Sequence, residues 1–185
     1  MLFVIINADD FYGRDSFVSI FSYLKNVSTD SKDYCMVSYY LKNTLSSNGV
    51  VSRGICDVLD GKLVNIVERL NVSCINGELF YDNGVNHIDN DALVSVNFWG
   101  FTPMIFQDAL RYFVEFFNEG GDLSKKESYL PTIVDKSIKE KVATVSVLST
   151  TSIFSGVTYS EDREKLQSYI NSLIDKGIYP KKLWN

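Results

Sequence analysis

The sequence predicts a single α/β domain in which a mostly parallel sheet, covered by helices, carries an inserted antiparallel β-ribbon. Three observations support this prediction. A strand, a helix and a second strand follow one another at the start of the chain, which is the order of a βαβ crossover. The middle of the chain has short strands separated by hairpin dipeptides. Strands alternate with helices again towards the end.

The first predicted element is an apolar strand over residues 3–6, which ends in two adjacent carboxylates, Asp9 and Asp10. Apolar side chains at helical spacing then predict a helix over residues 14–27. Residues 33–41 are rich in aromatic and β-branched side chains, which predicts the second strand. The predicted buried stripe of the helix is Phe17, Ile20, Phe21 and Leu24.

The middle segment, residues 49–88, reads as antiparallel ribbons lying beside or over the parallel core. Asp60-Gly61 joins two strand-like stretches and is a strong hairpin dipeptide, and Asn83-Gly84 is a second turn signal of the same kind. Residues 92–101 form the next predicted strand.

A helix after this strand is predicted from Thr102 as N-cap and Pro103 at the first helical position, with Gly120-Gly121 at its end. Residues 141–150 predict a further strand, and residues 160–177 a closing helix. The stripe expected to be buried on the first of these helices is Phe106, Leu110, Phe113 and Phe117. On the closing helix it is Leu166, Ile170 and Leu173.

The composition restricts the class of protein. With 185 residues, 45% hydrophobic and 22% charged, the chain is typical of one globular domain. A net charge of −5 argues against broad nucleic-acid or anionic-membrane binding. No apolar run has the roughly 20 residues that a membrane span needs, and we see no signal peptide. We therefore expect a cytoplasmic protein whose cysteines Cys35, Cys56 and Cys74 are buried and reduced.

Histidine chemistry is nearly excluded, because His87 is the only histidine and lies in a polar stretch. The acids Asp9 and Asp10 are the more promising feature, since they follow a buried strand. Ligands of open α/β sheets collect at the carboxyl ends of strands, and Mg²⁺ uses one or two carboxylates together with substrate phosphates. An Asx-type cap of the following helix explains the same residues equally well.

Three further places carry candidate binding residues. Gly54 within a strand often marks close approach of a ligand, and Arg53 beside it suits a phosphate, although a β-bulge with a solvent-facing arginine explains both. For Glu68 and Arg69 two interpretations are open: the two side chains form an ion pair on a ribbon, or they bind the hydroxyl groups of a polyol through hydrogen bonds. Asn97 lies inside an apolar strand and needs a polar partner, which indicates a site or a buried network.

Seven short motifs occur in order along essentially the whole chain: "NADDFYG", "SRGIC", "VER", "SVNFWGFTP", "ESYLPTIV", "GVTYSEDR" and "GIYPKKLW". As an ordered set they resemble the sugar-nucleotide pyrophosphorylase family, the NDP-sugar (sugar-1-phosphate) nucleotidyltransferases. The resemblance implies a Rossmann-like, GT-A-like mixed sheet. It also implies a transferase that joins an NTP to a sugar 1-phosphate with release of pyrophosphate, assisted by Mg²⁺.

The resemblance assigns roles to individual residues. Asp9 matches the family's metal-binding aspartate, with Asp10 as its neighbour in the catalytic site. Gly54 matches the backbone glycine that contacts the sugar, and Glu68-Arg69 match a Glu-Lys pair that contacts the sugar and its phosphate. Asn97 falls where the family has a polar residue near the sugar hydroxyls.

Two departures from the family pattern qualify what the resemblance implies. Phe154 and Gly156 stand where many members carry a second metal-binding aspartate. The glycine-rich, arginine-ended loop that holds the NTP phosphates is not found in the 185 residues. We therefore expect the chain, residues 1–185, to be the C-terminal portion of such a domain, incomplete at its N-terminus and weakly active or inactive alone. Its open strands would favour homo-oligomers or strand pairing. The alternatives are a non-catalytic interaction module and a choline-phosphate-type cytidylyltransferase.

Overall fold

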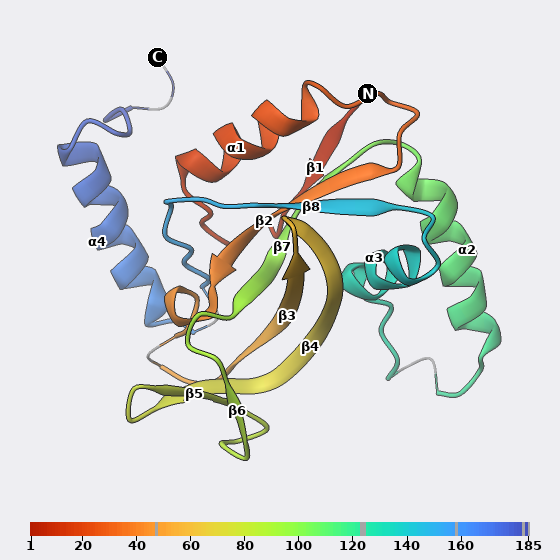
Figure 1. Cartoon of the computed structure of the whole chain (residues 1–185). Helices are drawn as coiled ribbons and strands as arrows, with labels where there is room; N and C mark the ends of the chain where they lie inside the picture. Colours follow the sequence, from red (N-terminus) through yellow and green to blue (C-terminus); the bar gives the residue numbers. More distant parts are fainter. Residues whose placement is uncertain (47, 123–124, 158, 183, 185) are drawn as a thin grey trace.

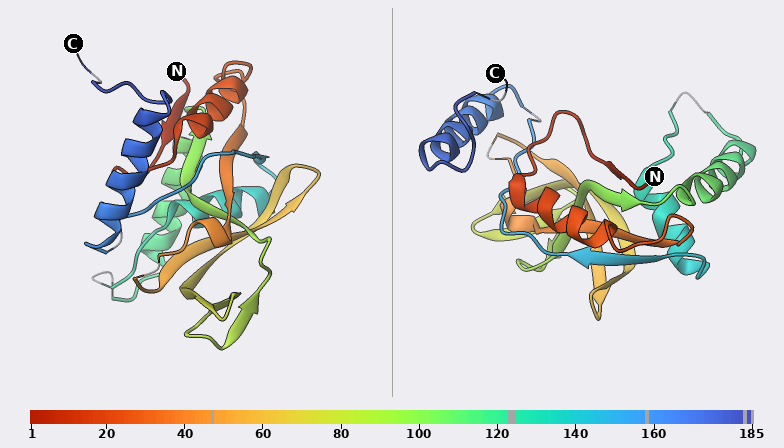
Figure 2. Two further views of the ribbon diagram at one scale, coloured as in Figure 1. Left: turned by 90° about the vertical axis from the view of Figure 1, so that its left-hand side faces the viewer. Right: turned by 90° about the horizontal axis from the view of Figure 1, so that it is seen from above.

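The computed structural model describes residues 1–46, 48–122, 125–157, 159–182 and 184 (Figures 1 and 2). This part of the chain contains eight strands and four α-helices. In chain order they are β1 (Phe3–Ile5), α1 (Arg14–Leu24), β2 (Asp33–Tyr40), β3 (Val51–Leu59), β4 (Lys62–Ile75), β5 (Glu78–Tyr81), β6 (Asn86–Ile88), β7 (Leu93–Phe101), α2 (Ile105–Asn118), α3 (Leu130–Lys139), β8 (Thr144–Leu148) and α4 (Asp162–Asp175).

Five of these strands form a closed β-barrel. Strand β7 pairs antiparallel with both β2 and β3, and β3 pairs antiparallel with β4. Strand β8 runs parallel to β2. The ring closes where Lys62 at the start of β4 lies opposite Ser146 of β8, and the backbone N–H of Val147 donates to the carbonyl of Gly61 at 2.9 Å.

The predicted Rossmann-like (GT-A-like) sheet, with its ribbon as an insertion, is therefore wrong. The β3–β4 ribbon is part of the barrel wall, because β3 is hydrogen-bonded to β7 and β4 reaches β8. Its register is irregular between Val51 and Arg53 and again between Asp57 and Val58. Such irregularities bend a strand and increase its twist, which lets the ribbon curl round until the sheet closes. The pairings are also mostly antiparallel, whereas a mostly parallel sheet was expected.

The remaining strands extend the barrel at two places. Strand β1 is added to the outside of β7, with Phe3 opposite Phe101 and Ile5 opposite Trp99. The β5–β6 hairpin continues from the far end of β4 (Figure 1). Both predicted hairpin turns are confirmed, and Asp60-Gly61 has the positive φ angles, 50° and 73°, that such a turn requires.

Two apolar clusters lie on opposite faces of β2, because successive side chains of a strand point to opposite sides. Cys35 and Val37 belong to one cluster, which also contains Ile20 of α1. Tyr34 and Met36 belong to the other, which includes Val134 of α3. Helices α1 and α3 thus cover the two faces, and α3 is an element that the sequence did not predict.

Several predicted buried side chains are exposed. On α1, Ile20 and Leu24 are buried as expected, whereas Phe17 and Phe21 are exposed. On α2 the whole predicted stripe is exposed, and the helix stands out from the barrel (Figure 2). Leu173 of α4 is buried as predicted. Periodicity identifies the apolar face of a helix but not what covers it.

The remaining predictions concern the cysteines, the single histidine and membrane-spanning helices. Cys35 and Cys56 are buried free thiols, but Cys74 is exposed, contrary to the prediction. His87 is exposed on β6. Among the described residues, no helix combines the length and the apolar character that crossing a membrane would require.

Candidate functional site

The turn after β1 directs one of the two adjacent acids inwards. The Asn7 side-chain amide donates to Asp10 Oδ2 at 2.9 Å, and the Asn7 backbone N–H donates to the hydroxyl of Tyr12 at 3.0 Å. Tyr12 is buried and donates in turn to the carbonyl of Val96 on β7, at 2.8 Å. These bonds tie the turn to the barrel, with Asp10 half-buried and Asp9 exposed to solvent.

A bulge in β7 brings Asn97 beside this turn. The β2–β7 register shifts between Met36 and Ser38, and Asn97 within the irregular stretch has a φ of 59°. Its side-chain amide donates to Asn7 Oδ1 at 3.4 Å, and its backbone N–H donates to Ser95 Oγ at 3.2 Å. Bulges and left-handed non-glycine residues are common next to functional sites because they aim a side chain that a regular strand would direct elsewhere.

Gly54 forms the floor of the same region. It lies on β3 between Glu68 of β4 and Ser95 of β7, which are its cross-strand neighbours. A Cβ atom added at Gly54 would come within 2.9 Å of Ile66 Cδ1 and 3.4 Å of Glu68 Oε2. Only glycine leaves this space open, which explains the residue type at the position.

These residues enclose a polar cavity of about 160 Å³. It brings together five of the seven site residues predicted from the sequence: Asp10, Arg53, Gly54, Glu68 and Asn97. The rest of its lining is Asn7, Ser52, Ser95, Val96, Tyr129, Pro131 and Phe154. We call this space the inner cavity.

Arg53 is the cation of the inner cavity. Its guanidinium donates to Thr44 Oγ1 at 3.1 Å, to the Thr44 carbonyl, and to the Ser52 carbonyl at 2.8 Å. It also lies over the ring of Phe154, 5.2 Å from the centroid. A guanidinium has five N–H donors, so these three bonds leave two for a ligand. In the described part of the chain, Arg53 makes no ion pair with a carboxylate within 4 Å.

Burial perturbs the charged groups around this cavity. It lowers the pKa of Arg53, an effect that the nearby carboxylates of Asp10 and Glu68 oppose. Burial likewise raises the pKa of Asp10, where the hydrogen bond from Asn7 acts in the opposite direction. Burial raises the pKa of Glu68, which Arg53 counteracts. One cation and two carboxylates therefore share a partly dehydrated space, which is typical of binding and catalytic sites.

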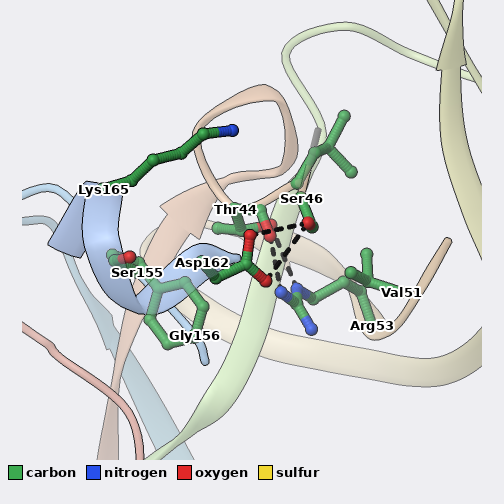
Figure 3. A pocket seen from close by; sticks show the side chains of 10 residues that line it. Thr44, Ser46, Val51, Arg53, Ser155, Gly156, Asp162 and Lys165 are labelled. Carbon is green, nitrogen blue, oxygen red and sulfur yellow. Dashed lines mark hydrogen bonds between the residues drawn. The ribbon is translucent and has the colours of Figure 1, made fainter. Parts of the chain in front are cut away.

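A second cavity of about 280 Å³, the outer cavity, shares Arg53 and Phe154 with the inner cavity. Figure 3 shows the outer cavity with Arg53 and Asp162 in its lining. Asp162 in the first turn of α4 projects into it and accepts hydrogen bonds from Ser46 Oγ at 2.9 Å and from the Tyr159 backbone N–H at 3.0 Å. The remaining lining is Thr44, Leu45, Val51, Ser155, Gly156 and Lys165.

The Asp162 carboxylate is occupied by hydrogen bonds from within the protein, so it serves to hold the structure together rather than to bind a ligand. Although its burial acts to raise the pKa, the hydrogen bonds from the Tyr159 N–H, Ser46 and Asn48 outweigh that effect and lower it. The Asn48 amide lies 2.7 Å from Asp162 Oδ1. The carboxylate thus fastens the segment before β3 to the start of α4, and this contact fixes the wall of the outer cavity.

Two predicted site residues lie elsewhere. Asp9 is exposed in the turn after β1. Arg69 is the strand neighbour of Glu68 and therefore points to the opposite side, where its guanidinium lies 4.6 Å from the ring centroid of Tyr81. There it lines a wider cavity of about 520 Å³, together with His87. The proposed roles of Asp9 and Arg69 stay predictions, since the structure does not bring them into the inner cavity.

Asn7, Ser95 and Tyr129 also line the inner cavity and were not predicted from the sequence. Asn7 had a usable signal, because it is a polar residue directly after a buried strand and only three positions before Asp10. Tyr129 lies within the motif "ESYLPTIV" but had no assigned role. Ser95 has no signal in the sequence, since its place follows from the pairing of β3 with β7.

The inner cavity offers oxygen ligands of the kind that Mg²⁺ prefers. Asp10 presents a carboxylate, and Asn7 a side-chain carbonyl oxygen. Gly156 leaves room beside Asp10, because a Cβ there would lie 3.0 Å from Asp10 Oδ1. No cluster of three or more His, Cys, Asp or Glu side chains suited to a metal occurs among the described residues. One protein carboxylate is nevertheless enough for an Mg²⁺ ion that also binds substrate phosphates.

No protein-family model matches the chain, and no curated protein matches it significantly. The fold and the site thus define a mixed α/β protein with a five-stranded barrel and a polar site of two adjoining cavities.

Proposed function

We propose that the protein binds a sugar 1-phosphate in the inner cavity, as part of a nucleotidyltransferase that joins an NTP to that sugar phosphate and releases pyrophosphate. The main support for this proposal is that one polar cavity is lined by five predicted site residues that are far apart in the sequence: Asp10, Arg53, Gly54, Glu68 and Asn97. The resemblance assigns roles to four of these residues, Asp10, Gly54, Glu68 and Asn97, and the residue type of Arg53 suits a phosphate.

The chemistry of the lining suits both parts of such a ligand. The Glu68 carboxylate and the Asn97 amide are partners for sugar hydroxyls, and Gly54 lets the sugar approach the backbone. The two remaining N–H groups of Arg53 suit phosphate oxygens, because a guanidinium binds them in bidentate fashion. The ligand phosphate would then lie between the inner and outer cavities, which share Arg53.

Asp10 is the residue we propose to hold Mg²⁺, with Asp9 as the alternative that the resemblance favours. When bound, the metal ion would neutralise charge that develops on the transferring phosphoryl group. The protein's own part is positional. Asn7 fixes the Asp10 carboxylate through its amide, and Arg53 supplies a fixed positive charge within a partly dehydrated site. We place the protein in the cytoplasm, where its free thiols stay reduced.

Binding of sugar 1-phosphates, measured by isothermal titration calorimetry with and without Mg²⁺, tests the proposal without needing the NTP. Glu68→Gln should weaken binding at least about tenfold, since a charged hydrogen bond to a hydroxyl contributes roughly 1.5–3 kcal/mol. Glu78→Gln is the matched control, because it makes the same charge change at an exposed ribbon position. Equal effects of the two substitutions, or no binding of any sugar 1-phosphate, would refute the proposed site.

Pyrophosphate release with a panel of NTPs and sugar 1-phosphates then tests catalysis. Asp10→Asn and Asp9→Asn, measured in parallel at varied Mg²⁺ concentration, separate the two candidate metal ligands. We expect Asp10→Asn to abolish release and Asp9→Asn to reduce it less, because only Asp10 faces the inner cavity. If binding is confirmed and no pair of substrates releases pyrophosphate, the chain is a binding module without activity of its own.

A choline-phosphate-type substrate belongs in the same panel. Tyr129 and Phe154 bring aromatic rings to the inner cavity beside the carboxylate of Glu68. Aromatic faces and an acid are the groups that bind quaternary ammonium ions. Preference for choline phosphate over all sugar 1-phosphates would replace the sugar in the proposal while leaving the phosphate role of Arg53 in place.

A further inference from the structure

Helix α2 exposes an apolar stripe along its length. Phe106, Leu110, Phe113, Val114 and Phe117 are each between 49% and 66% exposed. With roughly 200 Å² for a whole phenylalanine, this corresponds to on the order of 500 Å² of apolar surface. The largest contiguous apolar patch on a typical monomer is about 300–600 Å² and is often functional, so the size of this patch is compatible with an interaction site, and its arrangement has to decide. We call it the α2 stripe.

The spacing of the α2 stripe fits another helix. Phe106, Leu110, Phe113 and Phe117 follow one another at intervals of four, three and four residues, which is the repeat of helices that pack side by side. The positions that flank this seam carry no charge; they are Gln107, Ala109, Val114 and Phe116. A second copy of the same helix would therefore meet the seam without like-charge repulsion.

The opposite face of α2 is anchored to the rest of the molecule, which fixes the direction of the stripe. Ile105 and Tyr112 are buried, and the buried carboxylate of Asp108 pairs with Lys32 at 2.8 Å. Arg111 pairs with Glu140 after α3 at 2.7 Å. The exposure of the α2 stripe is thus a consequence of how α2 is attached, not of a loosely held helix.

The stripe continues onto the open edge of the sheet. The ring of Phe106 stacks on that of Phe3 in β1, with 5.3 Å between centroids. Among the described residues β1 pairs only with β7, so its other edge offers unpaired backbone groups. Side chains of β1 pack into both apolar clusters, Val4 into one and Ile5 into the other, as expected for a strand inside a sheet.

We propose that the α2 stripe and the β1 edge form the interface of a homodimer, in which α2 of one copy packs against α2 of the other across a twofold axis. Such an interface is self-complementary, and each copy presents the same apolar seam. A standard interface buries about 800 Å² per partner. The stripe supplies more than half of that, and the β1 edge with Phe3 adjoins it to supply the rest. This proposal does not depend on the proposed function.

Light scattering after size-exclusion chromatography, over a wide range of protein concentration, tests the proposal. The wild-type protein should have twice the 21.0 kDa mass of one chain. Leu110→Glu should raise the dissociation constant of the dimer by more than about tenfold, because it buries a charge at the centre of the seam. Leu59→Glu is the matched control, since Leu59 is 65% exposed and Leu110 66%, and Leu59 lies at the β3–β4 hairpin. It should remain a dimer.

Both positions are exposed, so both variants should keep the wild-type far-UV circular dichroism spectrum, which shows that they fold. Because dimer formation stabilises the native state, Leu110→Glu should melt at a lower temperature than Leu59→Glu at the same protein concentration. Three results would overturn the proposal. They are a wild-type protein that stays monomeric at every concentration, a dimer that Leu110→Glu leaves intact, and equal dissociation by Leu110→Glu and Leu59→Glu. If the pure chain is monomeric and the α2 stripe instead binds an unrelated protein, the homodimer proposal is likewise overturned.

Discussion

Gly54→Ala provides a test that separates the stability of the barrel from the binding capacity of the inner cavity. The added Cβ would lie 2.9 Å from Ile66 Cδ1 and 3.2 Å from Ile66 Cγ1, well inside an ordinary carbon–carbon contact. Overpacking of this kind costs about 1–3 kcal/mol. Replacing glycine by alanine within a strand returns roughly 0.5–1 kcal/mol of backbone entropy. We therefore expect Gly54→Ala to lower the free energy of unfolding by about 1 kcal/mol, within a range of roughly 0–2.5 kcal/mol.

Ile66→Val in the same chain tests the cause of that loss. It removes Cδ1, the atom nearest to the new methyl group, and by itself costs about 0.5–1.5 kcal/mol. If the contact is the cause, the double variant should be more stable than the sum of the single effects by at least about 1 kcal/mol. Urea unfolding followed by circular dichroism measures all four proteins, and additive effects would refute the steric argument.

Ligand binding by the same variants gives the second half of the test. The Gly54→Ala methyl group would also lie 3.4 Å from Glu68 Oε2, on the floor of the inner cavity, and Ile66→Val does not remove it. Sugar 1-phosphate binding should therefore stay weak in the double variant although the stability lost through the Ile66 contact is recovered. Binding that recovers together with stability would show that Gly54 acts only through the fold.

Three further predictions concern single polar groups. Asp162→Ala should lower the free energy of unfolding by about 1.5–3 kcal/mol in urea denaturation, since the buried carboxylate is lost as acceptor of hydrogen bonds from Ser46, Asn48 and the Tyr159 N–H, whereas its exposed neighbour Glu161→Ala should change it by less than about 0.5 kcal/mol. Asn97→Ala should be about 1 kcal/mol less stable than Asn97→Gly, because φ is 59° there, while both lose ligand binding equally in calorimetry. Burial raises the pKa of Asp10, so wild-type stability is lost as pH rises from the unfolded value near 3.8 through the folded pKa. Asp10→Asn should thus be at least as stable as wild type at neutral pH, and its advantage should vanish in acid unfolding titrations.

The elements of the fold could largely be predicted from the sequence, whereas its closure could not. Local signals were sufficient for the hairpin at Asp60-Gly61 and for the strand that ends before Asn7. Barrel closure depends on the pairing of Lys62 with Ser146, which are far apart in the chain. Neither residue carries a local signal of its partner, since any strand residue accepts a backbone neighbour.

The site shows the same division at the level of single residues. The residue types of Gly54, Arg53 and Asn97 were enough to predict them as site residues. A glycine within a strand often marks close approach of a ligand, and a polar or charged side chain there needs a hydrogen-bond partner. Which of two adjacent acids faces inwards depends on the turn geometry that Asn7 and Tyr12 fix. Strand alternation separates Glu68 from Arg69, but the sequence does not say which of the two sides holds the cavity.

Strand β7 has a consequence for how the protein is made. It is the neighbour of β1 and β2 and also of β3, although it follows all three in the chain. Until residues 93–101 have been synthesised, β1 and β2 lack the strand with which both pair, and their apolar side chains cannot pack as they do in the native sheet. Folding of this part is therefore expected to be a late, concerted event that begins when residues 93–101 emerge, with the β3–β4 hairpin already able to form ahead of it.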